Sequence, residues 1–236
     1  MTFDLWNTLI LEGPGGLLGP RAEQWDRILR SAGFSLPRDL LEAAHADALA
    51  AYVAAWERGE QFKSIEATSV ALAALGITVN ATQSKRLARS FHDAGLHSDI
   101  DLAPGALDVL DAIRAAGTQT AIICDIGLTP SSALRPLLRR AGILDRIVVE
   151  AWSDQIGAYK PDPAIFTWVL QRLDVPASSA LHVGDRLRTD VAGARDAGMR
   201  TVRYAGVFDD PAALPEADYV VFDLSAVMQV IEGSAD

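Results

Sequence analysis

The sequence contains almost no cysteine. Cys124 is the single one among 236 residues, which excludes an internal disulfide and a cysteine-based zinc cluster. A chain without disulfides is typical of a reducing compartment, so we expect a cytoplasmic protein.

Basic side chains are also scarce. The chain has 21 lysine and arginine residues against 31 acidic ones, which gives a net charge of −10. An acidic chain repels a phosphate polymer, so we expect no nucleic-acid partner. A small anion held at a local cationic site remains compatible with this charge.

Long apolar runs are missing as well. Residues 67–84 carry no charge, but Gly76, Asn80 and Gln83 interrupt them, so they do not form a membrane span. The first residues include the acidic Asp4 and lack the basic stretch followed by an apolar run that marks a signal peptide. We therefore expect no membrane partner and no leader sequence.

The composition nevertheless supports a large core. Half of the residues are hydrophobic and 22% are charged, which excludes disorder of the whole chain. A chain of this length buries about 70% of its unfolded surface and corresponds to one large domain with an insertion, or to two modest domains.

Two kinds of pattern divide the chain. Residues 1–11 read as a short apolar strand that breaks at the glycines and proline of 12–16. Residues 20–97 have apolar side chains at helical spacing and no strand pattern, which predicts an all-helical insertion. Its four expected helices are 21–32, 37–56, 64–75 and 82–94.

From Pro104 onward, short apolar strands alternate with helices. This alternation predicts right-handed βαβ units and a doubly wound, Rossmann-like parallel sheet covered on both faces. The expected strands are 120–124, 147–150, 180–183, 201–204 and 219–222, and the expected helices are 106–116, 131–141, 163–173, 191–197 and 225–231.

Acidic residues and one lysine follow the expected strands. Ligands collect at the carboxyl ends of parallel strands, and Asp4, Asp125, Asp185 and the nearby Asp190 all lie there, with Lys160 in another such loop. Grouped carboxylates require a compensating cation, and Mg²⁺ prefers oxygen ligands. A carboxylate beside Mg²⁺ and a lysine is equipped to attack phosphorus.

Three segments give the chain a family resemblance. Residues 3–9 (FDLWNTL), 160–166 (KPDPAIF) and 182–194 (HVGDRLRTDVAGA) resemble motifs of the haloacid dehalogenase-like (HAD) hydrolase superfamily, in its helical-cap subfamily. The resemblance implies a catalytic core of residues 1–12 and 99–236, with a helical cap at 13–98.

The resemblance also implies roles for individual residues. Asp4 is expected to be the nucleophile, with Lys160 steadying it and the phosphoryl group. The expected Mg²⁺ ligands are Asp4, the backbone carbonyl of Trp6, Asp185 and Asp190. Thr8, Cys124 and Asp125 fall at the expected phosphate-binding positions.

Two positions depart from the family pattern. Phosphatases of the family carry a second aspartate two residues after the nucleophile, where this chain has Trp6, whose indole cannot exchange a proton at neutral pH. The usual serine or threonine after the second strand is Cys124, and Asp125 beside it adds negative charge near the expected phosphate.

These features leave three functions open. We expect a magnesium-dependent phosphatase acting on a small phosphorylated metabolite through an aspartyl-phosphate intermediate, with weak turnover because of Trp6. The first alternative is a 2-haloacid dehalogenase-type carbon–halogen hydrolase, which needs no acid at position 6. The second is a non-catalytic ligand- or partner-binding protein. Substrate identity and oligomeric state have no readable sequence signal.

Overall fold

A computed structural model describes residues 1–12, 18–96 and 100–233. The chain forms two compact units, and we describe each by itself. One unit, the core, contains residues 1–12, 100–125 and 138–236, and the other, the helical unit, contains residues 13–99 and 126–137. Residues 126–137, which the sequence analysis placed in the core, group with the helices.

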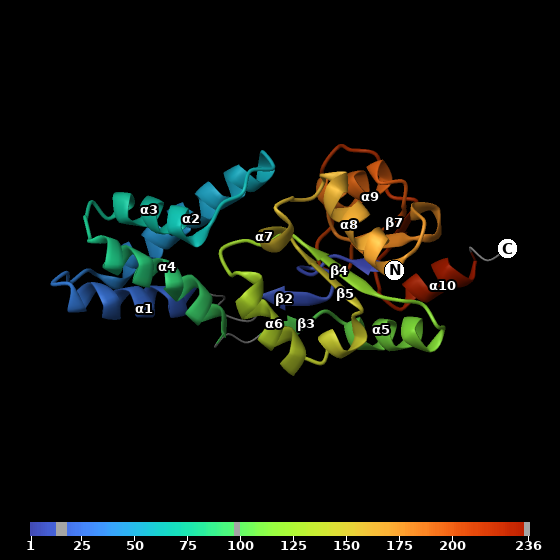
Figure 1. The fold of residues 1–236 in the computed structure, drawn as a ribbon, viewed down its shortest axis with the longest axis horizontal. Helices are drawn as coiled ribbons and strands as arrows, with labels where there is room; N and C mark the ends of the chain where they lie inside the picture. Colours follow the sequence, from blue (N-terminus) through green and yellow to red (C-terminus); the bar gives the residue numbers. More distant parts are fainter. Residues whose placement is uncertain (13–17, 97–99, 234–236) are drawn as a thin grey trace. The chain divides into compact units, whose positions relative to one another are not determined.

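A six-stranded parallel sheet organises the core (Figure 1). Its strand order is β5-β4-β1-β6-β7-β8. The order reverses on either side of β1, so β1 lies centrally between β4 and β6. The strands are β1 (Thr2–Phe3), β4 (Ala121–Cys124), β5 (Val149–Trp152), β6 (Leu181–Gly184), β7 (Arg200–Tyr204) and β8 (Tyr219–Val221).

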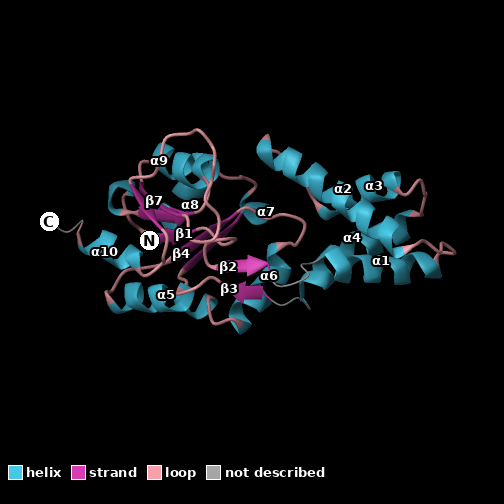
Figure 2. Cartoon of the chain, turned by 180° about the vertical axis from the view of Figure 1, so that it is seen from behind, coloured by secondary structure: helices cyan, strands magenta, loops and turns pink. Residues whose placement is uncertain are grey.

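Helices cover both faces of this sheet. Every residue of β4 and β6 is buried, as expected for parallel strands with helices on both sides. Helices α8 (Pro163–Leu173) and α9 (Ala192–Asp196) lie on one face, and α5 (Ala106–Ala115) and α10 (Ala226–Glu232) on the other (Figures 1 and 2). The doubly wound parallel α/β fold is confirmed.

Local sequence signals set the limits of α8. The side chain of Asp162 accepts a hydrogen bond from the backbone N–H of Ala164 at 2.9 Å, and Pro163 occupies the first helical position. Both features favour a helix start. The shorter elements of the core are α7 (Ser153–Ile156), the single turns η1 (Leu144–Arg146) and η2 (Ala177–Ser179), and the π-helical turn η3 (Leu187–Val191).

The N-terminal segment differs from its prediction. The single strand expected over 1–11 is two strands, β1 and β2 (Ile10–Glu12), separated by a tight turn. The carbonyl of Leu5 accepts from the N–H groups of both Leu9 and Ile10, at 2.9 and 3.0 Å. These bonds fold the chain back and end the first strand. Strand β2 then pairs antiparallel with β3 (Ile100–Leu102), a strand that the sequence analysis did not predict.

Four helices build most of the helical unit, close to the expected limits. They enclose a core centred on Trp25, Leu41, Leu87 and Phe91, each 1% exposed or less. The helices are α1 (Leu18–Ser31), α2 (Arg38–Glu57), α3 (Ser64–Ala74) and α4 (Ala81–Leu96). Most residues of α6 (Ser131–Arg140) also group with this unit.

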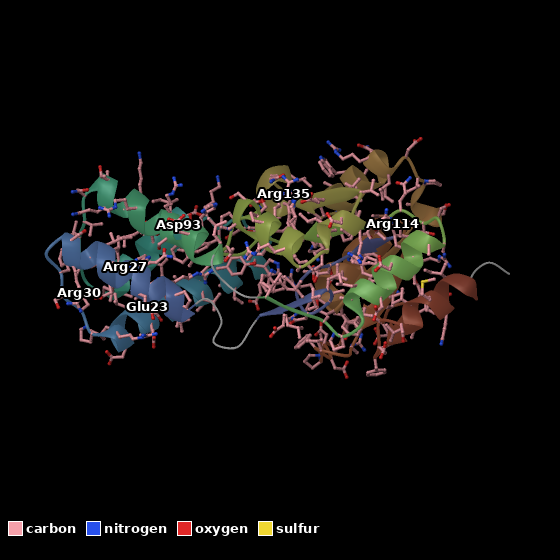
Figure 3. All side chains as sticks on the ribbon, turned by 90° about the horizontal axis from the view of Figure 1, so that it is seen from below. Glu23, Arg27, Arg30, Asp93, Arg114 and Arg135 are labelled. Carbon is pink, nitrogen blue, oxygen red and sulfur yellow. The ribbon has the colours of Figure 1, made fainter. Side chains whose placement is uncertain are left out.

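The outer surface of the helical unit is strongly charged. Glu23, Arg27 and Arg30 on α1 and Asp93 on α4 are labelled in Figure 3. The three α1 residues help to line a surface hollow of about 340 Å³, to which no predicted site residue contributes. Among the described residues, no helix combines the length and the apolar character that crossing a membrane requires.

Candidate active site

Three aspartates from separate segments meet in the core. Asp4 follows β1, Asp185 follows β6, and Asp190 lies within η3. One carboxylate oxygen of each lies within 4.8 Å of the others, and all three residues are buried. The adjacent parallel strands β1 and β6 end at the same edge of the sheet, and this geometry brings Asp4 and Asp185 together.

Lys160 lies between two of these carboxylates. Its Nζ atom donates to Oδ1 of Asp4 and to Oδ1 of Asp190, at 2.5 Å in both cases. Its side chain is only 2% exposed. A buried ammonium group is costly unless it is paired, and here two carboxylates stabilise it.

The electrostatic environment shifts the pKa values of the three aspartates in different directions. Burial raises the pKa of Asp4 well above its usual value, and Lys160 offsets this only in part. Burial, aided by the charge of Asp190, raises the pKa of Asp185 to about 7. Burial also acts on Asp190, but the charge of Lys160 and the hydrogen bond from His182 outweigh it and hold its pKa below the ordinary value.

Lys160 stays protonated in this setting. Burial alone would lower the pKa of its ammonium group, but Asp190 and Asp4 outweigh burial and raise that pKa well above its usual value. The lysine is therefore a fixed positive charge beside Asp4.

Asp190 has further partners that fix its orientation. Its Oδ2 accepts from the backbone N–H of Arg186 at 2.9 Å and from the Thr189 hydroxyl at 3.4 Å. Gly184 leaves the necessary space, because a Cβ there would lie 2.4 Å from Cγ of Asp190. The glycine before Asp185 is thus required by close packing.

Two supporting residues were not assigned from the sequence. The ring of His182 contacts Oδ1 of Asp190 through Nε2 at 3.3 Å and the hydroxyl of Thr2 through Nδ1 at 2.8 Å. Burial lowers the pKa of His182, so the ring is neutral and donates one N–H. The facing positions of Thr2 and His182 on neighbouring strands become visible only once the strand order is known.

Asn7 is the second missed residue. Its side-chain N–H donates to Oδ2 of Asp185 at 3.2 Å, and its backbone φ is 59°. Asparagine tolerates this left-handed conformation better than most residues. The sequence signal was therefore present, as an asparagine in the turn directly after Asp4.

The expected phosphate-binding positions have mixed environments. The Cys124 thiol is buried, which raises its pKa, and Sγ donates weakly to the Asp125 carbonyl. Oδ1 of Asp125 accepts from the backbone N–H of Lys160 at 2.9 Å, so this carboxylate holds the lysine loop. The Thr8 hydroxyl is buried with no hydrogen-bond partner among the described residues. Trp6 is partly exposed, and the roles of all these residues remain predictions.

The donor set of the three aspartates fits a hard divalent cation. Carboxylate oxygens are the ligands that Mg²⁺ prefers, and no nitrogen or sulfur donor belongs to the group. The raised pKa values of Asp4 and Asp185 reflect buried negative charge that a cation would offset. The described residues could therefore hold a metal ion at this position.

Comparisons with known proteins find relatives in one hydrolase family. The family model of haloacid dehalogenase-like hydrolases matches residues 1–198. Ribulose-1,5-bisphosphate 5-phosphatase of Halopiger xanaduensis is 35% identical over 106 residues, covering 45% of this chain and 43% of the relative. (S)-2-haloacid dehalogenase 1 of a Pseudomonas species is 30% identical over 138 residues, covering 58% and 56%. The chain thus spans about half the length of these curated relatives.

A solved structure shows the same fold over nearly the whole chain. The HAD phosphatase from Thermococcus onnurineus has a TM-score of 0.68 at 23% identity and covers 98% of this chain and 97% of its own. The family model covers most of the sequence, including all three motif segments. The chain belongs to the haloacid dehalogenase-like hydrolase family.

Proposed function

We propose that the chain is a magnesium-dependent phosphatase that acts on a small phosphorylated metabolite through an aspartyl-phosphate intermediate. One observation carries the proposal: Lys160 donates to both Asp4 and Asp190 at 2.5 Å, with Asp185 in the same carboxylate group. The phosphatase relative named above supports the same chemistry.

Asp4 is the nucleophile in this proposal. Lys160 binds one of its carboxylate oxygens, and the other attacks phosphorus as the ester P–O bond breaks. Water then attacks the phosphorus of the aspartyl phosphate, which releases phosphate and restores Asp4. A Mg²⁺ ion bound by Asp4, Asp185 and Asp190, together with the Trp6 carbonyl, would offset the charge of the phosphoryl oxygens.

Lys160 reduces repulsion between Asp4 and an incoming phosphate. Its ammonium group stays charged, and Asp190 and the Asp125 carboxylate hold it in place through its side chain and its backbone. Such preorganised charge is the main contribution that a protein makes to phosphoryl transfer.

Trp6 limits the substrates that are turned over well. No proton can come from its indole, so an alkyl leaving group departs without an acid at that position. We expect p-nitrophenyl phosphate, whose leaving group needs no proton, to be hydrolysed faster than alkyl phosphates. Trp6→Asp should raise kcat on alkyl phosphates and leave kcat on the nitrophenyl ester nearly unchanged.

The decisive experiment is a phosphate-release screen over a metabolite panel, with and without Mg²⁺. The wild-type chain is compared with Asp4→Asn, which keeps the shape of the side chain and removes the nucleophile. We expect Mg²⁺-dependent release that Asp4→Asn abolishes. Release that survives this substitution would disprove the covalent mechanism.

Trp6 is also compatible with a second candidate function, carbon–halogen hydrolysis. Carbon–halogen hydrolysis releases halide without protonation, and a haloacid dehalogenase is among the relatives. The buried group of three aspartates argues against it, because without a metal ion a single buried lysine offsets the charge of three carboxylates. Halide release from 2-chloropropionate in EDTA would support the dehalogenase, whereas phosphate release that EDTA abolishes would support the phosphatase.

A further inference from the structure

Arg186 is a cation at the edge of the carboxylate group. It directly follows Asp185, and its Nε lies 3.6 Å from Oδ2 of that residue. The two groups form an ion pair, although their separation exceeds hydrogen-bond distance. The side chain is 39% exposed, and within residues 1–12, 18–96 and 100–233 no hydrogen bond uses its guanidinium group. The donors of this group are therefore available to a ligand.

An aromatic ring holds this guanidinium in place. The Cζ atom of Arg186 lies 4.0 Å from the centroid of the Phe208 ring. Stacking on an aromatic face restrains an arginine while leaving its edge free to bind an oxyanion. Phe208 thus restrains a charged side chain that is 39% exposed.

The residues after Phe208 anchor its loop at two points. Oδ1 of Asp209 accepts from Nη1 of Arg203 at 2.6 Å, and Oδ2 of Asp210 accepts from the backbone N–H of Leu187 at 2.8 Å. The second bond ties the Phe208 loop directly to the segment that carries Arg186. Both members of the stacked pair, Arg186 and Phe208, therefore lie in segments that hydrogen bonds hold to the core.

Arg186 is a positive charge in a core whose net charge is strongly negative. Residues 13–99 and 126–137 contain ten acidic and ten basic side chains, so the core carries the entire net charge of −10. Lys160, the other cation beside the carboxylates, is already paired with two of them. Arg186 forms an ion pair with Asp185 at 3.6 Å, but among the described residues its guanidinium group donates no hydrogen bond.

We propose that Arg186, positioned by Phe208, binds a second negative group of the substrate. The substrate class is then a phosphomonoester that carries a further oxyanion, either a carboxylate or a second phosphate. A guanidinium edge binds both with paired N–H donors. This inference rests on the proposed phosphatase function, since it names the class of substrate that the same site takes.

Kinetics on matched esters test the proposal. Phosphoglycolate and ethyl phosphate differ by a carboxylate in place of a methyl group, and ethylene glycol bisphosphate adds a second phosphate instead. With Mg²⁺ present, Arg186→Gln should raise KM for the substrates with a second anion by about tenfold or more. The ratio of kcat/KM for phosphoglycolate to kcat/KM for ethyl phosphate should fall by the same factor, because ethyl phosphate lacks the second anion that Arg186 would bind.

Two further variants separate binding from folding. Phe208→Leu keeps the apolar volume but removes the stacking face, so it should raise KM for phosphoglycolate in the same direction by a smaller factor. Arg172 on α8 is a matched control, because its Cζ lies 3.3 Å from the Trp168 ring centroid but it is not one of the site residues. Arg172→Gln should change neither constant.

A binding measurement keeps this test independent of turnover. Phosphonoacetate and ethylphosphonate cannot be hydrolysed at a phosphate ester and differ by the same carboxylate. Calorimetric titration in Mg²⁺ should show tighter binding of phosphonoacetate, and Arg186→Gln should remove the difference. Equal binding of the two phosphonates, or a preference that survives Arg186→Gln, would overturn the role of Arg186. Absence of turnover with the preference intact would count against the phosphatase function alone.

Discussion

The same change, from aspartate to asparagine, should have opposite effects on stability at two neighbouring positions. Burial destabilises the charged form of Asp4, so its pKa is raised, whereas Lys160 and His182 stabilise the charge of Asp190, whose pKa is lowered. Neutralising Asp4 removes repulsion within the carboxylate group. Neutralising Asp190 removes the partner of Lys160 whose negative charge is stabilised by hydrogen bonds from Arg186 and His182.

The expected magnitudes follow from burial. Asp190 and Lys160 are 1% and 2% exposed and lie 2.5 Å apart, and breaking a buried ion pair costs about 3–5 kcal/mol. Asp190→Asn should lower the free energy of unfolding by this amount. Asp4→Asn should raise it by roughly 0.5–2 kcal/mol, the usual range for a single stabilising substitution.

Urea unfolding followed by circular dichroism, at pH 7 in EDTA, measures both effects. Asp196→Asn on the exposed end of α9 is the control, with an expected change within about 0.5 kcal/mol. Equal losses of stability in Asp4→Asn and Asp190→Asn would refute the electrostatic reasoning, because it requires effects of opposite sign.

Three more predictions concern the same site. The pKa of Asp185 is about 7 in the folded chain against an ordinary 3.8, so between these pH values the folded state binds a proton that the unfolded state has lost. The free energy of unfolding in EDTA should therefore fall as the pH rises from about 4 to 7, and Asp185→Asn should remove up to about 4 kcal/mol of this loss. Identical pH profiles for the two chains would contradict the shift. Mg²⁺ at a hundred times its dissociation constant should raise the free energy of unfolding of the wild-type chain by about 2.7 kcal/mol, and a gain of the same size in Asp185→Asn would show that the ion binds elsewhere. Gly184→Ala would place a Cβ 2.4 Å from Cγ of Asp190, so it should cost about 1–3 kcal/mol and remove activity, and a fully active variant would show that Asp190 can move without consequence.

The sequence predicted most of the fold because its signals are local. Alternating strands and helices identified the parallel sheet, and Asp162 with Pro163 marked the start of α8. The strand expected over 1–11 was wrong because its end depends on backbone bonds to Leu5 within a six-residue turn. Strand β3 was missed because its three residues are stabilised by pairing with β2 rather than by their own pattern.

The site was only partly predictable, because only some of its contacts have a local sequence signal. Acidic residues and a lysine at strand ends predicted the group formed by Asp4, Lys160, Asp185 and Asp190. The contacts that orient this group were not predictable, since they require strand register or side-chain direction. The stacking of Arg186 on Phe208 joins residues far apart in the chain and leaves no trace in any short motif.

The pairing of β2 with β3 affects how the length of the insert can vary during evolution. Residues 13–99 lie between β2 and β3 in the sequence, and Glu12 pairs with Ile100 across these two strands, so the core holds these two flanking residues about 5 Å apart. Joining ends that are already adjacent makes the entropic cost of a longer insert small, about 0.6 kcal/mol for each doubling of length. Natural variation can therefore lengthen, shorten or exchange this segment while the catalytic sheet keeps its register.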